Sequence, residues 1–218
     1  MNRGFHIYLD PLGDTVRVDE CSGASRRVKH ISLESFLSGV LACTEQRAIA
    51  YSGLLPSGCI AYNHSLEREV VCIEYPERYG DITYQETLYE RLPLPRLLFK
   101  FQYTPGRPVH TCWMAAAGEG RLRPSTPLYR FPFSNVYPDR RICLGRNALP
   151  AIDAPIQLQA LPELILRMPN NDDLYNPEAN RKGFCFRELL EYVREREPSV
   201  YYEELLLPDG HTLEQFIS

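Results

Sequence analysis

Residues 133–145 read FSNVYPDRRICLG, and this stretch decides how the chain around it is interpreted. An asparagine, Asn135, stands eight residues before a cysteine, Cys143, and a Tyr-Pro-Asp turn separates them. A cysteine thiolate can hold an acyl group as a thioester, and a carboxamide N–H can stabilise the charge that develops on the carbonyl oxygen during attack. The spacing therefore points to acyl transfer. A buried structural thiol and a turn-forming asparagine are the alternatives to these two roles.

The composition argues against several classes of protein. The 218 residues carry a net charge of −4, and the basic residues are scattered among acidic ones, so no nucleic-acid partner is expected. No apolar run reaches the length of a signal-peptide core or a membrane span, so we expect a cytoplasmic protein without a membrane partner. At about 150 residues per domain, the length favours one elaborated domain.

The seven cysteines indicate reduced thiols. An odd count without a C-x-x-C pair or closely spaced histidines fits neither a disulfide framework nor a zinc site. We therefore expect no metal and no cofactor, and we interpret most of the cysteines as small buried hydrophobic residues. They stand at positions 21, 43, 59, 72, 112, 143 and 185.

Residues 1–90 are predicted to form a β-rich N-terminal region with one helix, packed on the core. Alternating apolar residues predict a hairpin over residues 4–20, followed by an extended piece at 28–31. Ser32 is a candidate helix cap, and the apolar spacing over residues 33–41 predicts a helix with one buried face. Further strand-like segments occupy residues 48–51, 59–62 and 69–74.

Residues 91–198 are predicted to form the catalytic core. Prolines bias residues 92–95 toward extended backbone, and apolar runs at 97–103 and 109–117 predict a second hairpin. Residues 104–107, Thr-Pro-Gly-Arg, supply the turn between these two runs.

Helical spacing replaces alternation after Cys143. The predicted helices cover residues 156–168, where Pro162 breaks the helix or begins a second one, and residues 184–197, which Pro198 ends. Strands followed by helices predict an α+β fold.

Residues 199–218 are predicted to form a C-terminal appendage of unknown purpose. Its pattern indicates a strand at 201–207 and a turn at 208–210, before a last apolar segment at 213–217.

The stretch at 133–145 resembles the active-site segment of ubiquitin-conjugating (E2) enzymes. In those enzymes a His-Pro-Asn element is followed by Val/Ile-Tyr, a short turn and Ile/Val-Cys-Leu. Phe133 and Ser134 replace the His and Pro here. The resemblance implies the E2 (UBC-like) fold, an antiparallel sheet followed by helices, with an N-terminal β-rich extension in this chain. The matching residues are Asn135, Val136, Tyr137, Pro138, Ile142, Cys143 and Leu144.

A second element strengthens the resemblance. E2 enzymes commonly carry Pro-Asn after the helix behind the active site, followed by an acidic residue that approaches the cysteine. Residues 169–173, Pro-Asn-Asn-Asp-Asp, and 177–179, Pro-Glu-Ala, resemble this element and put Asp173 at the acidic position.

With the stretches at 54–58 and 92–95, the sequence is similar to a bacterial E2-like family, protein B of ParB-related, ThiF-related cassettes (prokaryotic E2 family D). The resemblance covers roughly residues 50–190.

The resemblance implies an E2-like conjugating transferase. An E1-like activating enzyme of the ThiF family would present a ubiquitin-like modifier as a thioester, Cys143 would take it, and a lysine or another acceptor would then attack. Asn135 would hold the oxyanion or brace the loop, and Asp173 and Tyr137 would orient an incoming lysine. A JAB-type metallopeptidase often accompanies such cassettes and is a further partner that the resemblance suggests.

Two other functions stay open. A catalytically inactive E2-like scaffold would bind the modifier or the E1 without turnover. An unrelated cysteine hydrolase would pair Cys143 with a histidine, but no histidine lies in a recognisable partner motif. The histidines are His6, His30, His64, His110 and His211.

Overall fold

A computed structural model describes residues 3–10, 13–22, 25–47, 52–65 and 68–218. The described residues fall into two compact units, Met1–Tyr51 and Ser52–Ser218. The predicted strand at 48–51 lies outside the described residues.

The N-terminal unit is an antiparallel sheet followed by a helix. Strands β1 (Arg3–Leu9), β2 (Thr15–Ser22) and β3 (Ser25–Ser32) pair in chain order. The predicted hairpin over residues 4–20 is confirmed by the pairing of β1 with β2. Helix α1 (Leu33–Arg47) follows, and the Ser32 hydroxyl accepts a hydrogen bond from the Ser35 N–H at 3.1 Å, as expected of an N-cap.

The prediction that one face of this helix is buried is wrong for the described residues of this unit. Leu37, Val40 and Leu41 are about half exposed or more, at 49%, 46% and 62%. Their spacing follows helical periodicity, but the described residues do not bury them, and the sheet also leaves Phe5, Ile7 and Leu9 exposed. The spacing alone therefore identified the helix without identifying what it packs on.

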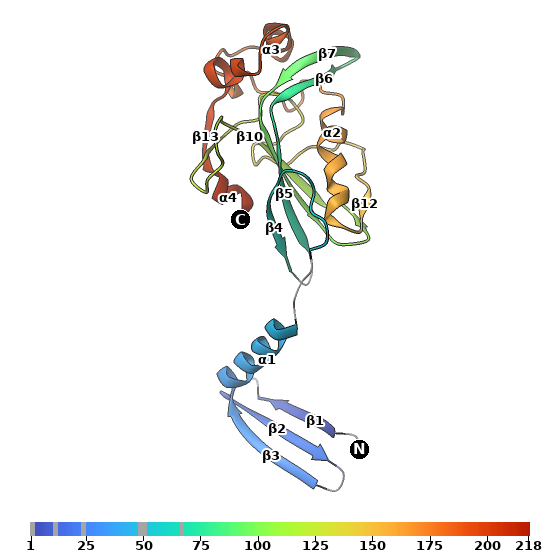
Figure 1. Cartoon of the computed structure of the whole chain (residues 1–218), viewed down its shortest axis with the longest axis vertical. Helices are drawn as coiled ribbons and strands as arrows, with labels where there is room; N and C mark the ends of the chain where they lie inside the picture. The colour runs from blue at the N-terminus through green and yellow to red at the C-terminus, as the bar shows by residue number, and fades with distance from the viewer. Residues whose placement is uncertain (1–2, 11–12, 23–24, 48–51, 66–67) are drawn as a thin grey trace. The chain divides into compact units, whose positions relative to one another are not determined.

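The second unit is built around one antiparallel sheet, of which β4, β5, β10 and β13 are labelled in Figure 1. Its strand order is β13-β11-β10-β8-β5-β4, so the last strand of the chain closes one edge. The strands are β4 (Cys59–His64), β5 (Glu69–Tyr75), β8 (Leu97–Tyr103), β10 (Thr111–Ala117), β11 (Pro127–Tyr129) and β13 (Pro208–Thr212). The predicted hairpin over 97–117 is confirmed by the pairing of β8 with β10.

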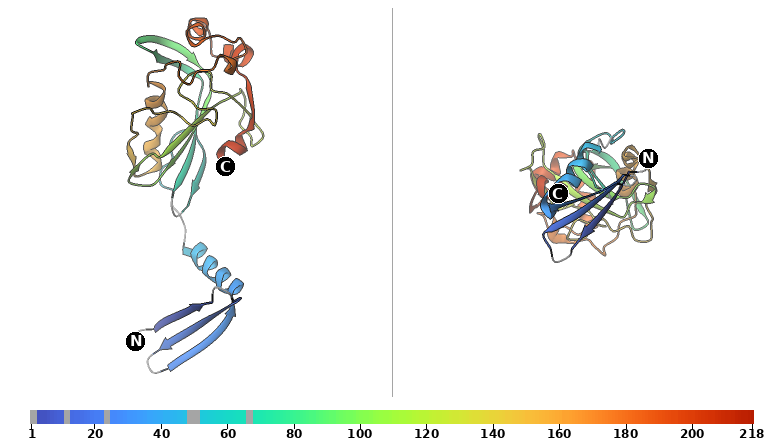
Figure 2. Two further views of the ribbon diagram at one scale, coloured as in Figure 1. Left: turned by 180° about the vertical axis from the view of Figure 1, so that it is seen from behind. Right: turned by 90° about the horizontal axis from the view of Figure 1, so that it is seen from below.

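The two faces of this sheet bury different sets of residues. Phe99 and Met114 are cross-strand partners on one face, and they join the main core together with helix α2 (Leu161–Leu166) and helix α3 (Phe186–Val193). Leu98 and Ala115, the adjacent pair, face a smaller core with helix α4 (Leu213–Ile217). The views in Figures 1 and 2 accordingly show α2 and α4 on opposite sides of the sheet.

The helices after Cys143 largely follow the prediction. A 3₁₀ helix, η1 (Pro155–Ala160), leads into α2, and Pro162 lies in the first turn of α2, where its missing N–H costs nothing. Helix α3 buries Leu189, Leu190 and Val193 as expected, but it ends earlier than the predicted residue 197. A further 3₁₀ turn, η2 (Pro177–Ala179), lies between α2 and α3.

The tail differs from its prediction. Residues 201–207 were expected to be a strand, but Tyr201–Leu205 form a π-helical turn, η3, and the strand β13 covers the segment expected as a turn. The apolar residues at 201–207 predicted a strand because such residues are common in strands. The strand instead forms at 208–212, where the backbone pairs with β11. The observed α+β architecture, with mostly antiparallel sheets, matches the predicted class.

The compact units do not coincide with the predicted boundaries at residues 90 and 198. Strand β5 pairs with β8, so residues on both sides of position 90 share one sheet, and β13 joins the same sheet from the tail.

Sequence reasoning also missed the hairpin of β6 (Arg78–Tyr84) and β7 (Thr87–Leu94). The short strands β9 (Arg107–Pro108) and β12 (Ala151–Ile152) form another small pair.

Candidate active site

The segment from Asn135 to Cys143 is a miniature hairpin. The Cys143 N–H donates to the Asn135 carbonyl oxygen at 2.8 Å, and the Tyr137 N–H donates to the Arg141 carbonyl oxygen at 2.9 Å. The Arg140 N–H closes the turn on the Tyr137 carbonyl oxygen at 2.8 Å, and Arg140 has a left-handed φ of 69°. The two residues that sequence reasoning singled out are therefore adjacent because the intervening turn folds back on itself.

This hairpin is fixed to the central sheet through β10. The Ile142 N–H donates to the Cys112 carbonyl oxygen, and the Met114 N–H donates to the Arg140 carbonyl oxygen, both at 2.9 Å. Ile142 is buried in the main core. The backbone immediately before Cys143 is thus held by a strand of the sheet.

Asn135 holds the start of the hairpin against the segment after α2. Its φ is 63°, a left-handed conformation that asparagine tolerates better than most residues. Its side-chain Nδ2 donates to the Pro169 carbonyl oxygen at 2.9 Å. The hairpin and the Pro169-Asn170 segment, which the resemblance treated as separate elements, are in direct contact.

Asn170 extends that contact into the core. It is buried, its Nδ2 donates to the carbonyl oxygens of Thr83 and Met168, and its own N–H donates to the Thr83 carbonyl oxygen at 2.8 Å. Asn170 and Asn135 both line a small hollow of about 10 Å³ that also borders Cys143. Strand β6 therefore supports the segment to which Asn135 donates its hydrogen bond.

Cys143 is partly exposed, and its sulfur is contacted by Tyr137. The Tyr137 hydroxyl lies 3.4 Å from Sγ, and this hydrogen bond raises the pKa of the phenol, so the hydroxyl is a proton donor at neutral pH. By contrast, burial raises the thiol pKa of Cys72 and Cys112 to about 12, which leaves those two sulfurs protonated and inert. Within the described ranges no histidine is hydrogen-bonded to Cys143.

The structure does not bring Asp173 into contact with the sulfur. Its carboxylate is exposed and accepts a hydrogen bond from Asn171 Nδ2 at 2.9 Å. The neighbouring Asp172 accepts from the Tyr84 hydroxyl at 2.9 Å and so is tied to β6. Hydrogen bonds link Cys143 with Asn135 and with Tyr137, and within the described ranges none joins Asp173 to these three residues.

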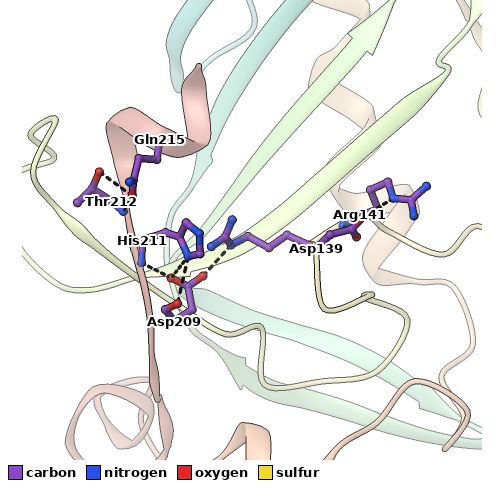
Figure 3. Close-up of polar contacts among 7 residues, drawn as sticks. Asp139, Arg141, Asp209, His211, Thr212 and Gln215 are labelled. Atoms are coloured by element: carbon purple, nitrogen blue, oxygen red, sulfur yellow. Dashed lines mark hydrogen bonds and ion pairs between the residues drawn. The ribbon is translucent and has the colours of Figure 1, made fainter.

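The two arginines before Cys143 have different environments, and Figure 3 labels Arg141 with its partner Asp139, and Asp209, the partner of Arg140. Arg141 pairs with Asp139 at 2.6 Å in an ion pair whose side chains are more than half exposed. Arg140 pairs with Asp209 of β13 at 2.7 Å, with side chains 20% and 8% exposed. Tyr137, Arg140 and Asp209 border one groove of about 260 Å³.

Sequence reasoning missed Ser134, Asn170 and Asp209 as individual contributors. The Ser134 hydroxyl is buried beside Cys143 and has no hydrogen-bond partner within the described part of the chain. Asn170 was recognised only as part of a motif. Nothing in the sequence links Asp209 to residue 140, because the pair is joined by folding across 69 positions.

The described residues contain no cluster of three or more potential metal ligands. Where the structure describes a helix, none has both the length and the apolar character of a membrane span.

Comparison with known proteins identifies a family. A sequence model of prokaryotic E2 family D matches residues 35–166, which is more than half of the 218 residues. The match contains the whole hairpin with Asn135, Tyr137 and Cys143 and ends before Asp173 and β13. No curated protein and no solved structure matches the chain significantly. The chain belongs to prokaryotic E2 family D.

Proposed function

We propose that this protein is an E2-like carrier enzyme with a UBC-like catalytic core that holds a ubiquitin-like protein as a thioester on Cys143. One observation carries the proposal. In a chain of an E2 family, a partly exposed cysteine lies on a sheet-anchored hairpin whose asparagine side chain grips the Pro169-Asn170 segment. Such anchoring favours acyl transfer because the sulfur and its surroundings keep one geometry while a large substrate approaches.

The reaction has two balanced steps. The Cys143 thiolate attacks the thioester carbonyl of the modifier on an E1-like ThiF-type partner, a new C–S bond forms, and the partner's thiolate leaves. A lysine amine or another acceptor then attacks that carbonyl, a C–N bond forms, and the Cys143 thiolate leaves while the amine proton passes to solvent. Each carbonyl is already activated as a thioester, so the protein's task is to position the groups and to stabilise charge.

The surrounding residues take complementary roles. Asn135 braces the loop through Pro169, and its second amide hydrogen is the candidate donor to an oxyanion. The Tyr137 hydroxyl donates to the sulfur, which stabilises the thiolate as nucleophile and as leaving group. Asp173 is proposed to meet the incoming lysine, and its exposed carboxylate is accessible to an acceptor protein.

The partners follow from these steps. The E1-like enzyme and the ubiquitin-like modifier are required partners, and a JAB-type metallopeptidase that releases the modifier would fit the same pathway. The central test incubates the protein with a ThiF-type E1, a ubiquitin-like protein ending in glycine, and ATP, followed by electrophoresis without reductant. We expect an adduct that reductant removes.

Two cysteine variants make the assay specific. Cys143→Ser should convert the adduct into an ester that resists reductant and yields to hydroxylamine. Cys185→Ser is the matched control, because Cys185 is also exposed but lies at the start of α3. It should leave the adduct unchanged.

Asp173→Asn separates the second step from the first. It should leave loading of Cys143 intact and slow discharge to lysine, most clearly near neutral pH. If the wild-type protein forms no adduct but binds the modifier or the E1, the inactive scaffold is the better description. If the adduct survives Cys143→Ser as a thioester, Cys143 is not the acceptor.

A further inference from the structure

The C-terminal strand β13 reaches the hairpin that carries Cys143. The Arg140 Nε lies 2.7 Å from Asp209 Oδ2, and the two side chains are 20% and 8% exposed. Figure 3 shows Asp209 and His211 on this strand, outside the region that the family match covers. Part of the segment that the sequence left as an appendage therefore contributes directly to the surroundings of the candidate site.

Both members of the pair lie in segments that also make backbone hydrogen bonds. Arg140 closes the turn with Tyr137 and offers its carbonyl oxygen to the Met114 N–H of β10. Asp209 Oδ1 accepts the His211 N–H at 2.9 Å, which leaves Oδ2 directed at the guanidinium. The pairing of Pro208 with Tyr129 and of Thr212 with Pro127 holds the strand in place. The ion pair therefore joins the turn of the hairpin to the edge strand of the sheet.

We infer that Asp209 is a positioning residue for Cys143. Through Arg140 it fixes the turn from Tyr137 to Arg140, and through that turn it keeps the Tyr137 hydroxyl against the sulfur. The catalytic meaning of this inference rests on the proposed function. Without the carboxylate, a guanidinium that is four-fifths buried has no opposite charge and turns toward water. The Arg140 backbone belongs to the turn, so the turn shifts with it.

The neighbouring ion pair provides a matched comparison. Asp139 and Arg141 belong to the same hairpin, but their side chains are 53% and 54% exposed, so water can replace the lost charge partner. An asparagine at either position keeps an oxygen for the backbone N–H that the aspartate accepts, so each substitution removes the charge alone. Removing the Asp139 carboxylate should leave the turn where it is, whereas removing the Asp209 carboxylate should not.

The test measures the alkylation rate of Cys143 by iodoacetamide in the full chain, with the Cys143 peptide followed by mass spectrometry at pH 7. Asp209→Asn and Arg140→Gln should each slow alkylation about threefold or more, because the thiolate loses the Tyr137 hydrogen bond. Asp139→Asn should stay within about twofold of the wild type. General loosening of the fold would expose the sulfur and speed alkylation, so a slower rate distinguishes positioning from lost stability.

A second variant tests the route through Tyr137. In a Tyr137→Phe background, Asp209→Asn should have no additional effect, since the contact it protects is already gone. An Asp209→Asn rate equal to or faster than wild type, or an undiminished effect in the Tyr137→Phe background, overturns the inference.

Because alkylation needs neither E1 nor modifier, its failure is distinguishable from a failure of the proposed function. A wild-type protein that forms no adduct refutes the carrier function without changing the alkylation result. A wild-type protein that loads normally while Asp209→Asn alkylates normally refutes only the positioning role.

Discussion

Replacing Asn135 tests whether its side chain chiefly braces the hairpin. Asn135→Ala removes the hydrogen bond to Pro169, about 1 kcal/mol, and places a less tolerant residue at a φ of 63°, which costs about 1 kcal/mol more. We expect the free energy of unfolding to fall by about 2 kcal/mol. Asn135→Gly removes the same hydrogen bond, but glycine adopts a positive φ without steric cost. The free energy of unfolding should therefore fall by only about 1 kcal/mol.

The measurement is urea unfolding followed by tryptophan fluorescence. Trp113 is the chain's single tryptophan and forms an isolated bridge with Arg141 of the hairpin, so it reports on this region. With a urea dependence of about 2 kcal/mol per molar, the Ala and Gly midpoints should differ by about 0.5 M. If the alanine variant proves as stable as the glycine variant, the argument from backbone conformation is refuted.

The same two variants separate bracing from oxyanion stabilisation. If Asn135 mainly braces, discharge of the Cys143 thioester in the glycine variant should slow less than about tenfold. Loss of an oxyanion donor typically slows the chemical step by about 100-fold to 1,000-fold. A loss of that size in both variants, with unchanged loading, would contradict the bracing role.

Three further predictions concern the core and the N-terminal unit. Phe133→His restores the residue type that E2 enzymes have, but it buries an imidazole in an aromatic core. The free energy of unfolding, measured by Trp fluorescence in urea, should fall by about 3 kcal/mol. An unchanged urea midpoint would contradict this. Ser134→Ala removes a buried hydroxyl without a partner in the described residues and should raise the free energy of unfolding by about 1 kcal/mol, whereas a lower urea midpoint would show that the hydroxyl is satisfied. Hydrogen bonds from Arg17 and Arg26 lower the pKa of Asp19 to about 2, so its stabilisation is complete above the unfolded pKa of about 3.9 and is lost as the pH falls toward 2. Amide exchange in β1–β3 should therefore accelerate in that window, and Asp19→Asn should flatten the dependence.

The local structure was predictable where short-range rules decide it. The first hairpin, the cap at Ser32 and the proline at the start of α2 all follow from chemistry within a few residues. The hairpin of β6 and β7 was missed because its turn, Tyr84-Gln85-Glu86-Thr87, contains none of the usual turn residues. Gln85 adopts a φ of 53° there, a conformation that its sequence does not announce.

The site was predictable to the extent that it is contiguous. Cys143, Asn135 and Tyr137 lie within nine residues of one another, and the turn between them brings them together. Contacts between distant segments, such as Asn135 with Pro169 and Arg140 with Asp209, depend on the complete fold and leave no local pattern. The position proposed for Asp173 rests on the motif, and its exposed side chain hydrogen-bonds locally to Asn171.

The placement of β13 and α4 has a consequence for biosynthesis. These elements are synthesised after the other strands of the sheet, yet β13 pairs with β11 and α4 covers Leu98 and Leu128. Until then the growing chain presents an unpaired strand edge and an uncovered apolar surface, the features that invite self-association and chaperone binding. A chain cut short before Pro208 would keep both features permanently and would therefore stay prone to aggregation.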